Sequence, residues 1–148
     1  MRLTVLFLIA LGVTVAKNDA ITNVKGLWVA VIDRCDFGTA PRPLLLALDV
    51  TKSADRLKVI ELSNGEGADL AERQYVVGRG VLPIRSDLGS AKINGRAVVL
   101  ESSDRVEQWR ISEDGSELIV SRLITALPAR QQTLIFRRTQ SIPENVSR

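Results

Sequence analysis

The sequence predicts an all-β protein that folds into an antiparallel, up-and-down barrel of about eight to ten short strands. Apolar residues recur mostly at every second position, and clusters of Gly, Pro, Asn or Asp interrupt these runs about every 8–12 residues. Beyond the N-terminal segment, the chain has no convincing amphipathic helical pattern. Short connections favour pairing between strands that are neighbours in sequence, and closing the sheet into a barrel removes its exposed edges.

Residues 1–16 have the pattern of a secretory signal peptide. Arg2 supplies the basic start, residues 3–13 are mostly apolar, and Thr14 and Ala16 stand at positions −3 and −1 of a cleavage site. The apolar run is shorter than the roughly 20 residues with which a helix spans a bilayer. We therefore expect a secreted or periplasmic protein, cleaved after Ala16, with no transmembrane segment in the mature chain.

The remaining residues form three expected parts. Residues 17–23 predict a flexible lead-in, residues 24–139 a single β-barrel domain, and residues 140–148 a disordered tail. With 45% hydrophobic and 25% charged residues, the composition is that of an ordinary globular domain. The domain is long enough to bury a core without a disulfide.

The first predicted strand, Val24 to Ile32, is apolar on both faces and carries Trp28. Such a strand is typical of a position that is covered on both sides. A long loop follows, from Asp33 to Pro43, in which two prolines prevent a regular element from continuing. We expect this loop to lie across one mouth of the barrel, with Cys35, Phe37 and Pro41 as its mouth residues.

The later strands alternate with polar turns. They are predicted at residues 44–50, 56–62, 69–77, 81–85, 91–93, 96–100, 105–111, 118–124 and 133–138. Asn94-Gly95 is the strongest hairpin signal, because both residues suit the positive φ angles of a type I′ turn. Residues 69–77 also have helical propensity, and Pro83 marks its strand as an edge or bulged strand.

The residue inventory excludes several kinds of chemistry. The chain has no His, which rules out Ser-His-Asp and Cys-His nucleophilic systems and the usual zinc sites. The acidic clusters at residues 33–36 and 64–69 lack the spacing of a calcium loop. Nothing in the sequence brings the carboxylates of Asp49, Glu101 and Glu107 together as a hydrolytic pair. We therefore predict no catalytic residue, no metal site, no cofactor and no enzyme activity.

Charge and cysteine content narrow the range of partners. The formal net charge is +3, but the arginines are scattered, so the basic face that nucleic acid requires is missing. The single Cys35 cannot form an intrachain disulfide, and we expect a buried, inert thiol.

Four large apolar side chains could line a cavity: Trp28, Tyr75, Trp109 and Phe136. A barrel of this size either fills with such side chains or holds a small ligand. Strand alternation puts Phe136 and Arg138 on one face. If Phe136 points inward, Arg138 can stack on Trp28, a cation–π contact of about 1 kcal/mol or more.

Several short motifs resemble those of small secreted bacterial lipocalin-like β-barrel proteins of unassigned function. Gly26-Leu27-Trp28 looks like the Gly-X-Trp opening of lipocalin-type barrels, and Arg137-Arg138 stands where those proteins keep a cation across that Trp. The segments Cys35 to Pro41 and Trp109 to Val120 are similar to further elements of these proteins. The resemblance implies a lipocalin-like barrel closed through Gly26, Trp28 and Arg138, an exported location and little chemistry.

The leading functional hypothesis is an exported module that binds a small apolar ligand, with no nucleic acid partner. The alternative is a filled barrel that binds another protein or an envelope component through its loops, without ligand or catalysis.

Overall fold

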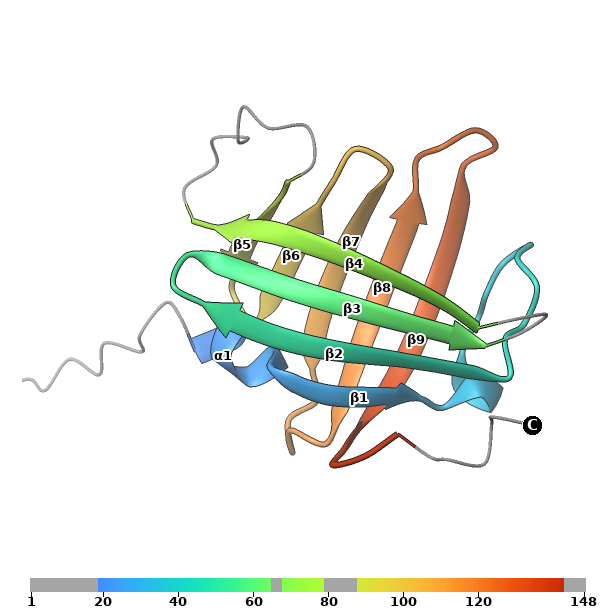
Figure 1. Ribbon diagram of the computed structural model, residues 1–148, viewed down its shortest axis with the longest axis horizontal. Coiled ribbons are helices and arrows are strands. Elements are labelled where there is room, and N and C mark those ends of the chain that lie inside the picture. The colour runs from blue at the N-terminus through green and yellow to red at the C-terminus, as the bar shows by residue number, and fades with distance from the viewer. Residues whose placement is uncertain (1–18, 65–67, 79–87, 143–148) are drawn as a thin grey trace, which may run out of the picture.

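The computed structural model describes residues 19–64, 68–78 and 88–142. Within them, nine strands close in sequence order into one barrel, because the first strand pairs with the last (Figure 1). The predicted signal peptide, the predicted strand at residues 81–85 and residues 143–148 of the predicted tail lie outside the described residues. No helix in the described part of the chain is long and apolar enough to cross a membrane.

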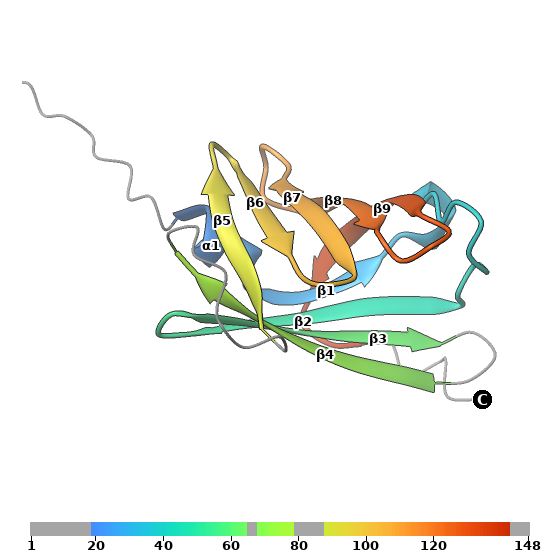
Figure 2. The same ribbon diagram turned by 90° about the horizontal axis from the view of Figure 1, so that it is seen from above.

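The elements are short. The helical elements are α1, Asp19–Val24, and the 3-10 turn η1, Ile32–Arg34. The strands are β1, Gly26–Ala30; β2, Leu45–Ser53; β3, Arg56–Asn64; β4, Ala68–Val77; β5, Gly89–Asn94; β6, Ala97–Glu101; β7, Arg105–Ile111; β8, Glu117–Ile124; and β9, Arg130–Thr139. In Figure 2, β2, β3 and β4 lie in one layer of the flattened barrel and β5 to β9 in the other.

The prediction of an all-β barrel is confirmed, but strictly antiparallel pairing is wrong at one place. β4 and β5 run parallel, with Tyr75 opposite Gly89 and Val77 opposite Ala91. A parallel pair needs a longer connection than a hairpin turn, and the chain between Val77 and Gly89 supplies one. Every other neighbouring pair is antiparallel, including β5 and β6, so the predicted hairpin forms. Its turn residues are Gly95, with a φ of 61°, and Arg96, whereas Asn94 is the last residue of β5 and has no positive φ; the predicted type I′ turn at Asn94-Gly95 is therefore wrong by one residue.

Residues 19–23 of the predicted flexible lead-in, 17–23, instead form α1 together with Val24, and residues 17–18 lie outside the described residues. The first strand, predicted from Val24 to Ile32, is therefore shorter, Gly26–Ala30. Ile21 and Val24 are both buried in the main core, and α1 packs against β6 and β7. The two side chains are three positions apart, so one face of this short helix carries both of them. Burial of these two side chains against the barrel therefore stabilises a helix in a segment whose sequence is mostly polar.

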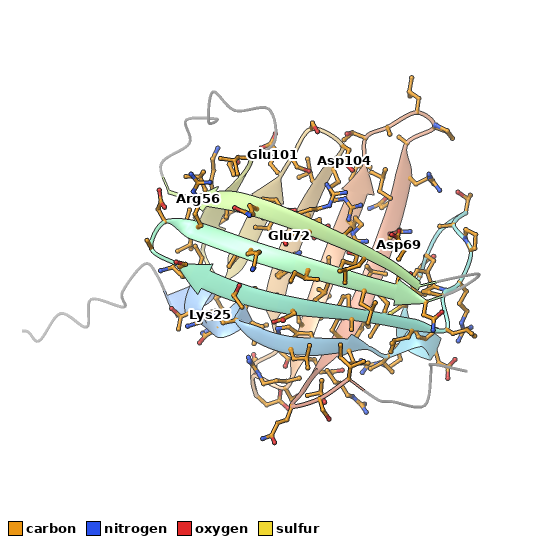
Figure 3. All side chains as sticks on the ribbon, in the orientation of Figure 1. Lys25, Arg56, Asp69, Glu72, Glu101 and Asp104 are labelled. Carbon is orange, nitrogen blue, oxygen red and sulfur yellow. The ribbon has the colours of Figure 1, made fainter. Side chains whose placement is uncertain are left out.

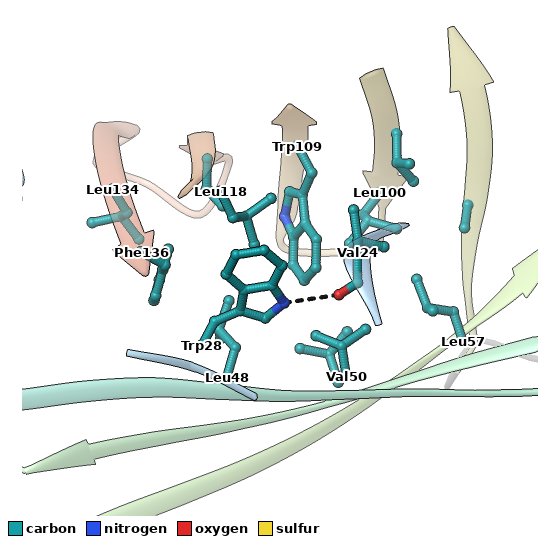
Figure 4. Close-up of a cluster of buried hydrophobic side chains, with 14 of the residues drawn as sticks. Val24, Trp28, Leu48, Val50, Leu57, Leu100, Trp109, Leu118, Leu134 and Phe136 are labelled. Atoms are coloured by element: carbon teal, nitrogen blue, oxygen red, sulfur yellow. Dashed lines mark hydrogen bonds between the residues drawn. The ribbon is translucent and has the colours of Figure 1, made fainter. Parts of the chain in front are cut away.

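The core extends through the barrel from the end that α1 covers, and Figure 4 shows part of it. Trp28, Trp109 and Phe136 are all buried there, and the Trp28 Nε1 donates a hydrogen bond of 2.9 Å to the Val24 carbonyl. The end of the barrel that α1 covers, which we call the helix end, also carries the turns at residues 54–55, 95–96 and 112–116. The opposite end, which we call the loop end, carries residues 31–44, 102–104 and 125–129.

The barrel closes where β1 pairs with β9, with Trp28 opposite Arg138. The Arg138 guanidinium carbon lies 4.2 Å from the centroid of the Trp28 ring. Gly26 has a φ of 125°, and a Cβ at this position would lie 2.9 Å from the Arg138 Nη1. Glycine is therefore required here both by the backbone angle and by the space that the arginine occupies.

Candidate functional site

The inner face of the barrel changes from apolar to charged toward the loop end. On β7, the buried Glu107 stands two residues from the buried Trp109, so strand alternation turns both side chains inward. On β8, the buried Arg122 follows Val120 in the same way, and on β3 Glu61 follows Val59. The strands thus place acids and arginines directly beyond the packed core.

Glu107 is the centre of this interior network. One carboxylate oxygen accepts a hydrogen bond from the Trp109 Nε1 at 2.6 Å. The other accepts from the Arg122 Nε at 2.9 Å and from the Arg105 Nη1 at 3.3 Å. The side chains of Glu107 and Arg122 are only 3% and 6% exposed, so this ion pair lies in the interior of the barrel.

Arg122 is held by two carboxylates at once. Besides the bond to Glu107, its Nη2 and Nη1 donate to the two oxygens of Glu61, at 2.6 and 3.4 Å. Burial by itself lowers the pKa of Arg122, but Glu107 and Glu61 offset that effect and the pKa is raised. All three guanidinium nitrogens therefore have an acidic partner.

Arg105 is less completely paired. Its Nη1 lies 3.3 Å from Glu107 and 3.7 Å from Glu61. Its buried Nε has no hydrogen-bond acceptor among the described residues; the Oδ2 of Asp104 lies 3.7 Å away, beyond bonding distance. One buried donor of the network is thus left for another group.

A further ion pair joins β4 to the turn between β6 and β7. Arg73 donates to both carboxylate oxygens of Asp104, at 2.7 and 2.9 Å, and Ser102 donates to one of them at 2.9 Å. Partial burial would raise the pKa of Asp104, but the hydrogen bonds from Arg73 and Ser102 lower it to about 2. Asp104 in this turn and Glu72 on β4 can be followed in Figure 3.

A pocket of about 310 Å³ lies beside this ion pair, between residues 71–75 of β4, Gly89 and the turn residues Ser102 and Ser103. Among the described residues, β4 pairs with β5 only from Tyr75 to Val77, which leaves the earlier part of β4 without a partner on that side. The pocket opens at this interruption of the sheet.

Tyr75 connects the pocket to the interior network. It is buried, and burial raises its pKa far above the usual value. Glu107 adds to that rise, while Arg73, Arg105 and Arg122 oppose it, so all four charges act on the phenol. Gly89 allows the close packing, because a Cβ there would lie 2.5 Å from the Tyr75 ring.

The four predicted cavity residues, Trp28, Tyr75, Trp109 and Phe136, all belong to one packed core. Tyr75 is the one of the four that also lines the pocket. The carboxylates of Asp49, Glu101 and Glu107, which nothing in the sequence brings together, differ in burial: Asp49 and Glu101 are exposed and Glu107 is inside. In the described part of the chain, no three Cys, Asp or Glu side chains form a group that could hold a metal ion.

The predicted mouth loop lies at the loop end and is tied to β9. Asp36 and Thr133 exchange backbone hydrogen bonds of 2.8 and 2.9 Å, and the Gln132 side chain donates to the Phe37 carbonyl at 3.1 Å. Cys35 and Phe37 are partly buried against the core, whereas Pro41 is exposed. The loop is therefore anchored near the interior network.

The sequence interpretation missed most of the network. It treats Arg73, Arg105 and Arg122 only as scattered charges and singles out neither Glu61 nor Asp104. The usable signal was strand alternation. Arg105 and Glu107 share a face with Trp109, and Arg122 shares a face with Val120. A charge on a face that is otherwise apolar indicates a buried polar site.

No protein-family model matches the sequence, and no curated protein matches it. Solved structures do match the fold. The zebrafish ileal bile acid-binding protein complexed with cholic acid has a TM-score of 0.54 at 9% identity, over 79% of this chain and 99% of that chain. The siderocalin Ex-FABP, described as having dual ligand specificities, has 0.55 at 10% identity, over 84% and 79%. A mutant of the fatty acid transporter REP1-NXSQ has 0.53 at 12% identity, over 80% and 99%.

The fold is that of the lipocalin and fatty-acid-binding barrels. At these identities the likeness concerns the path of the backbone, and the chemistry of the interior is argued from this chain's own residues.

Proposed function

We propose that this protein is an exported carrier that binds a small molecule with an apolar body and one polar end. The observation that carries the proposal is the interior network around Glu107, Arg105 and Arg122, which adjoins the pocket through Tyr75 and Arg73. In small-molecule sites, a few convergent polar groups fix the orientation of the bound molecule.

The energetics of the network support a functional role. Moving charged groups out of water is unfavourable, and well-packed apolar residues of similar volume often serve a fold equally well or better. Elsewhere the interior follows that rule, because the helix end is packed with apolar side chains. Charges retained at the loop end are explained if they orient a bound molecule.

The comparisons agree with this proposal. The matching structures include one bound to cholic acid and one named as a fatty acid transporter, and both are barrels whose whole length is covered by this chain. Export is supported by the N-terminal pattern of residues 1–16, which is typical of a secretory signal peptide. We place the carrier in the periplasm or outside the cell.

Native mass spectrometry of the protein purified from its own host tests the function. We expect a retained non-covalent mass that is lost on denaturation. Ala71→Trp, which places a large side chain in the pocket, should abolish the retained mass. The matched control is Ser53→Trp, at an exposed position on the helix end. Bare wild-type protein, together with no thermal shift across a broad panel of lipids and metabolites, would contradict the carrier function.

The alternative, an interaction module without ligand, is favoured by one observation. Three leucines at the loop end are strongly exposed: Leu44 by 72%, Leu70 by 68% and Leu127 by 94%. A contiguous exposed apolar patch is typical of a protein contact, and these three leucines lie in segments at the same end of the barrel. If wild-type protein carries no ligand, replacing these leucines with serine and following retention of partners in a pull-down tests this second function.

A further inference from the structure

We propose that Glu107 makes this barrel selective for an uncharged ligand whose polar end is a hydrogen-bond acceptor, such as an ester carbonyl. This inference rests on the proposed carrier function and names the ligand class for the same site. It follows from how completely the network neutralises itself.

The charges of the connected network are balanced by the protein alone. Arg130, on the inward face of β9, has a buried Nε without a partner among the described residues and stands outside this network. Three arginines and three acids form the connected set of ion pairs, namely Arg73, Arg105, Arg122, Glu61, Asp104 and Glu107. A charged ligand that bound among them would add one uncompensated charge to a largely buried site. Such a charge is strongly unfavourable in a poorly solvated environment.

An acidic ligand would also have to compete with built-in carboxylates. The three nitrogens of Arg122 already donate to Glu107 and Glu61. A ligand carboxylate could bind this guanidinium only by displacing one of them, which would leave a buried glutamate without its partner. The position that would receive an acid is thus occupied by the protein's own side chains.

A cationic ligand would likewise have to compete with the protein's own arginines for the carboxylates. Both oxygens of Glu107 already accept hydrogen bonds, from Trp109, Arg122 and Arg105. Both oxygens of Glu61 accept from Arg122. An ammonium group would therefore have to break an existing ion pair and leave an arginine unpaired.

One donor remains for a neutral group. The buried Arg105 Nε has no acceptor among the described residues and lies 3.7 Å from Asp104. Asp104 also pairs with Arg73, and Arg73 lines the pocket. A carbonyl oxygen that reached it from the pocket would satisfy this N–H without changing the charge balance. A buried donor gains a hydrogen bond in this way at little electrostatic cost.

Titration calorimetry with three probes of equal chain length tests the proposal on the full mature chain: methyl decanoate, decanoate and decylammonium. We expect methyl decanoate to bind at least about tenfold more tightly than either ion at neutral pH. Equal or tighter binding of decanoate or of decylammonium by the wild-type protein would overturn the selectivity and leave the carrier function standing.

Glu107→Gln gives a second, sharper comparison. The amide keeps the shape of the side chain but removes one negative charge, so the network gains a net positive charge. Decanoate should then bind about tenfold more tightly than it does to wild type, with methyl decanoate changed far less. Glu101→Gln, at an exposed position on β6, is the matched control and should change neither affinity.

Two further measurements distinguish a misfolded variant, or a protein that carries no ligand, from a carrier that lacks the proposed selectivity. If Glu107→Gln is unfolded by circular dichroism, Glu61→Gln replaces it, because that change also removes one charge from the same network. If wild type binds none of the probes, the charge of the molecule retained in native mass spectrometry tests the selectivity. An ionic molecule overturns the proposed selectivity, and a neutral molecule supports it. Bare protein in that measurement overturns the carrier function and this inference with it.

Discussion

The guanidinium of Arg138 lies 4.2 Å from the ring centroid of Trp28, although the two residues come from the last and the first strand. The same side chain donates to the Lys25 carbonyl at 2.7 Å and to the Asn23 carbonyl at 2.8 Å. One arginine therefore joins β9 to β1 and to the C-terminal end of α1. This contact closes the barrel at the helix end.

Arg138→Ala should lower the free energy of unfolding by about 2 kcal/mol, because it removes the cation–π contact and two charge-assisted hydrogen bonds near the surface. Urea denaturation followed by tryptophan fluorescence measures the loss. Arg137→Ala is the matched control, since its side chain is 65% exposed, and it should cost less than about 0.5 kcal/mol. Equal effects of the two substitutions would contradict a specific role for Arg138.

Trp28→Ala should cost about 3–5 kcal/mol, since the ring is fully buried among core side chains and its removal leaves a cavity. The loss includes the hydrogen bond from Nε1 to the Val24 carbonyl. Thermal and urea unfolding of the variant, compared with wild type, measure it. A loss below about 1 kcal/mol would show that this residue is not part of the cooperative core.

Sequence reasoning recovers those parts of the fold that local chemistry determines. Alternation along β9 places Phe136 inward and Arg138 on the same face, and the structure has both. Asn94-Gly95 predicts the hairpin between β5 and β6, and Gly95 does take a positive φ there, although Asn94 itself ends β5. In these places the local sequence is enough to predict the structure, because each strand pairs with the next one and strand alternation determines which side chains face inward.

The remaining features depend on contacts that no local pattern carries. α1 exists because Ile21 and Val24 are buried in the barrel's core, and the parallel pairing of β4 and β5 depends on a connection rather than on either strand. The network around Glu107 is assembled from β3, β7 and β8. Alternation shows that such charges face inward, but not which of them meet.

Cys35 should react slowly with iodoacetamide. Burial raises the pKa of its thiol, and the backbone N–H of Ile135 and the charges of Arg34 and Arg42 only partly oppose the rise. The sulfur also lies 3.3 Å from the Val31 carbonyl and from the Ile135 nitrogen. At pH 8 the native protein should be alkylated about tenfold more slowly than the urea-unfolded protein, as followed by mass spectrometry. Equal rates, or a disulfide-linked dimer on a non-reducing gel, would contradict the inert thiol.

The Arg73–Asp104 pair should make stability depend on pH in the acid range. The pKa of Asp104 is about 2 in the folded protein against 3.8 ordinarily, so the unfolded chain binds more protons between these values. The contribution is therefore complete above about pH 4 and is lost as the pH falls toward 2. Because the side chain is 39% exposed, solvent screening limits it to about 1 kcal/mol.

Asp104→Asn isolates this contribution. The variant should be less stable than wild type at pH 6, and the difference should disappear near pH 2, as measured by urea unfolding at several pH values. Asp114, whose pKa is also about 2, is present in both proteins, so its own titration cancels in the comparison. A difference that does not change with pH would show that Asp104 acts through packing rather than through its charge.

The network around Arg122 should stabilise the protein only as long as it is complete. Arg122→Met alone leaves Glu61 and Glu107 without their main partner and should cost about 3–5 kcal/mol. Adding Glu61→Gln and Glu107→Gln removes these two carboxylates but leaves Arg105 with only Asp104, at 3.7 Å, and the remaining network with one excess positive charge. The triple variant should therefore regain part of the loss, about 2 kcal/mol. Urea unfolding measures both steps.

Ligand measurements on the triple variant separate the two roles of the network. If the charges serve binding, this variant should fold with part of the lost stability restored yet lose the preference for methyl decanoate over decanoate, because the fixed carboxylates that exclude an acid are gone. A triple variant that is no more stable than Arg122→Met alone would instead show that the network holds the fold together, which would remove the energetic argument for a ligand site at the loop end.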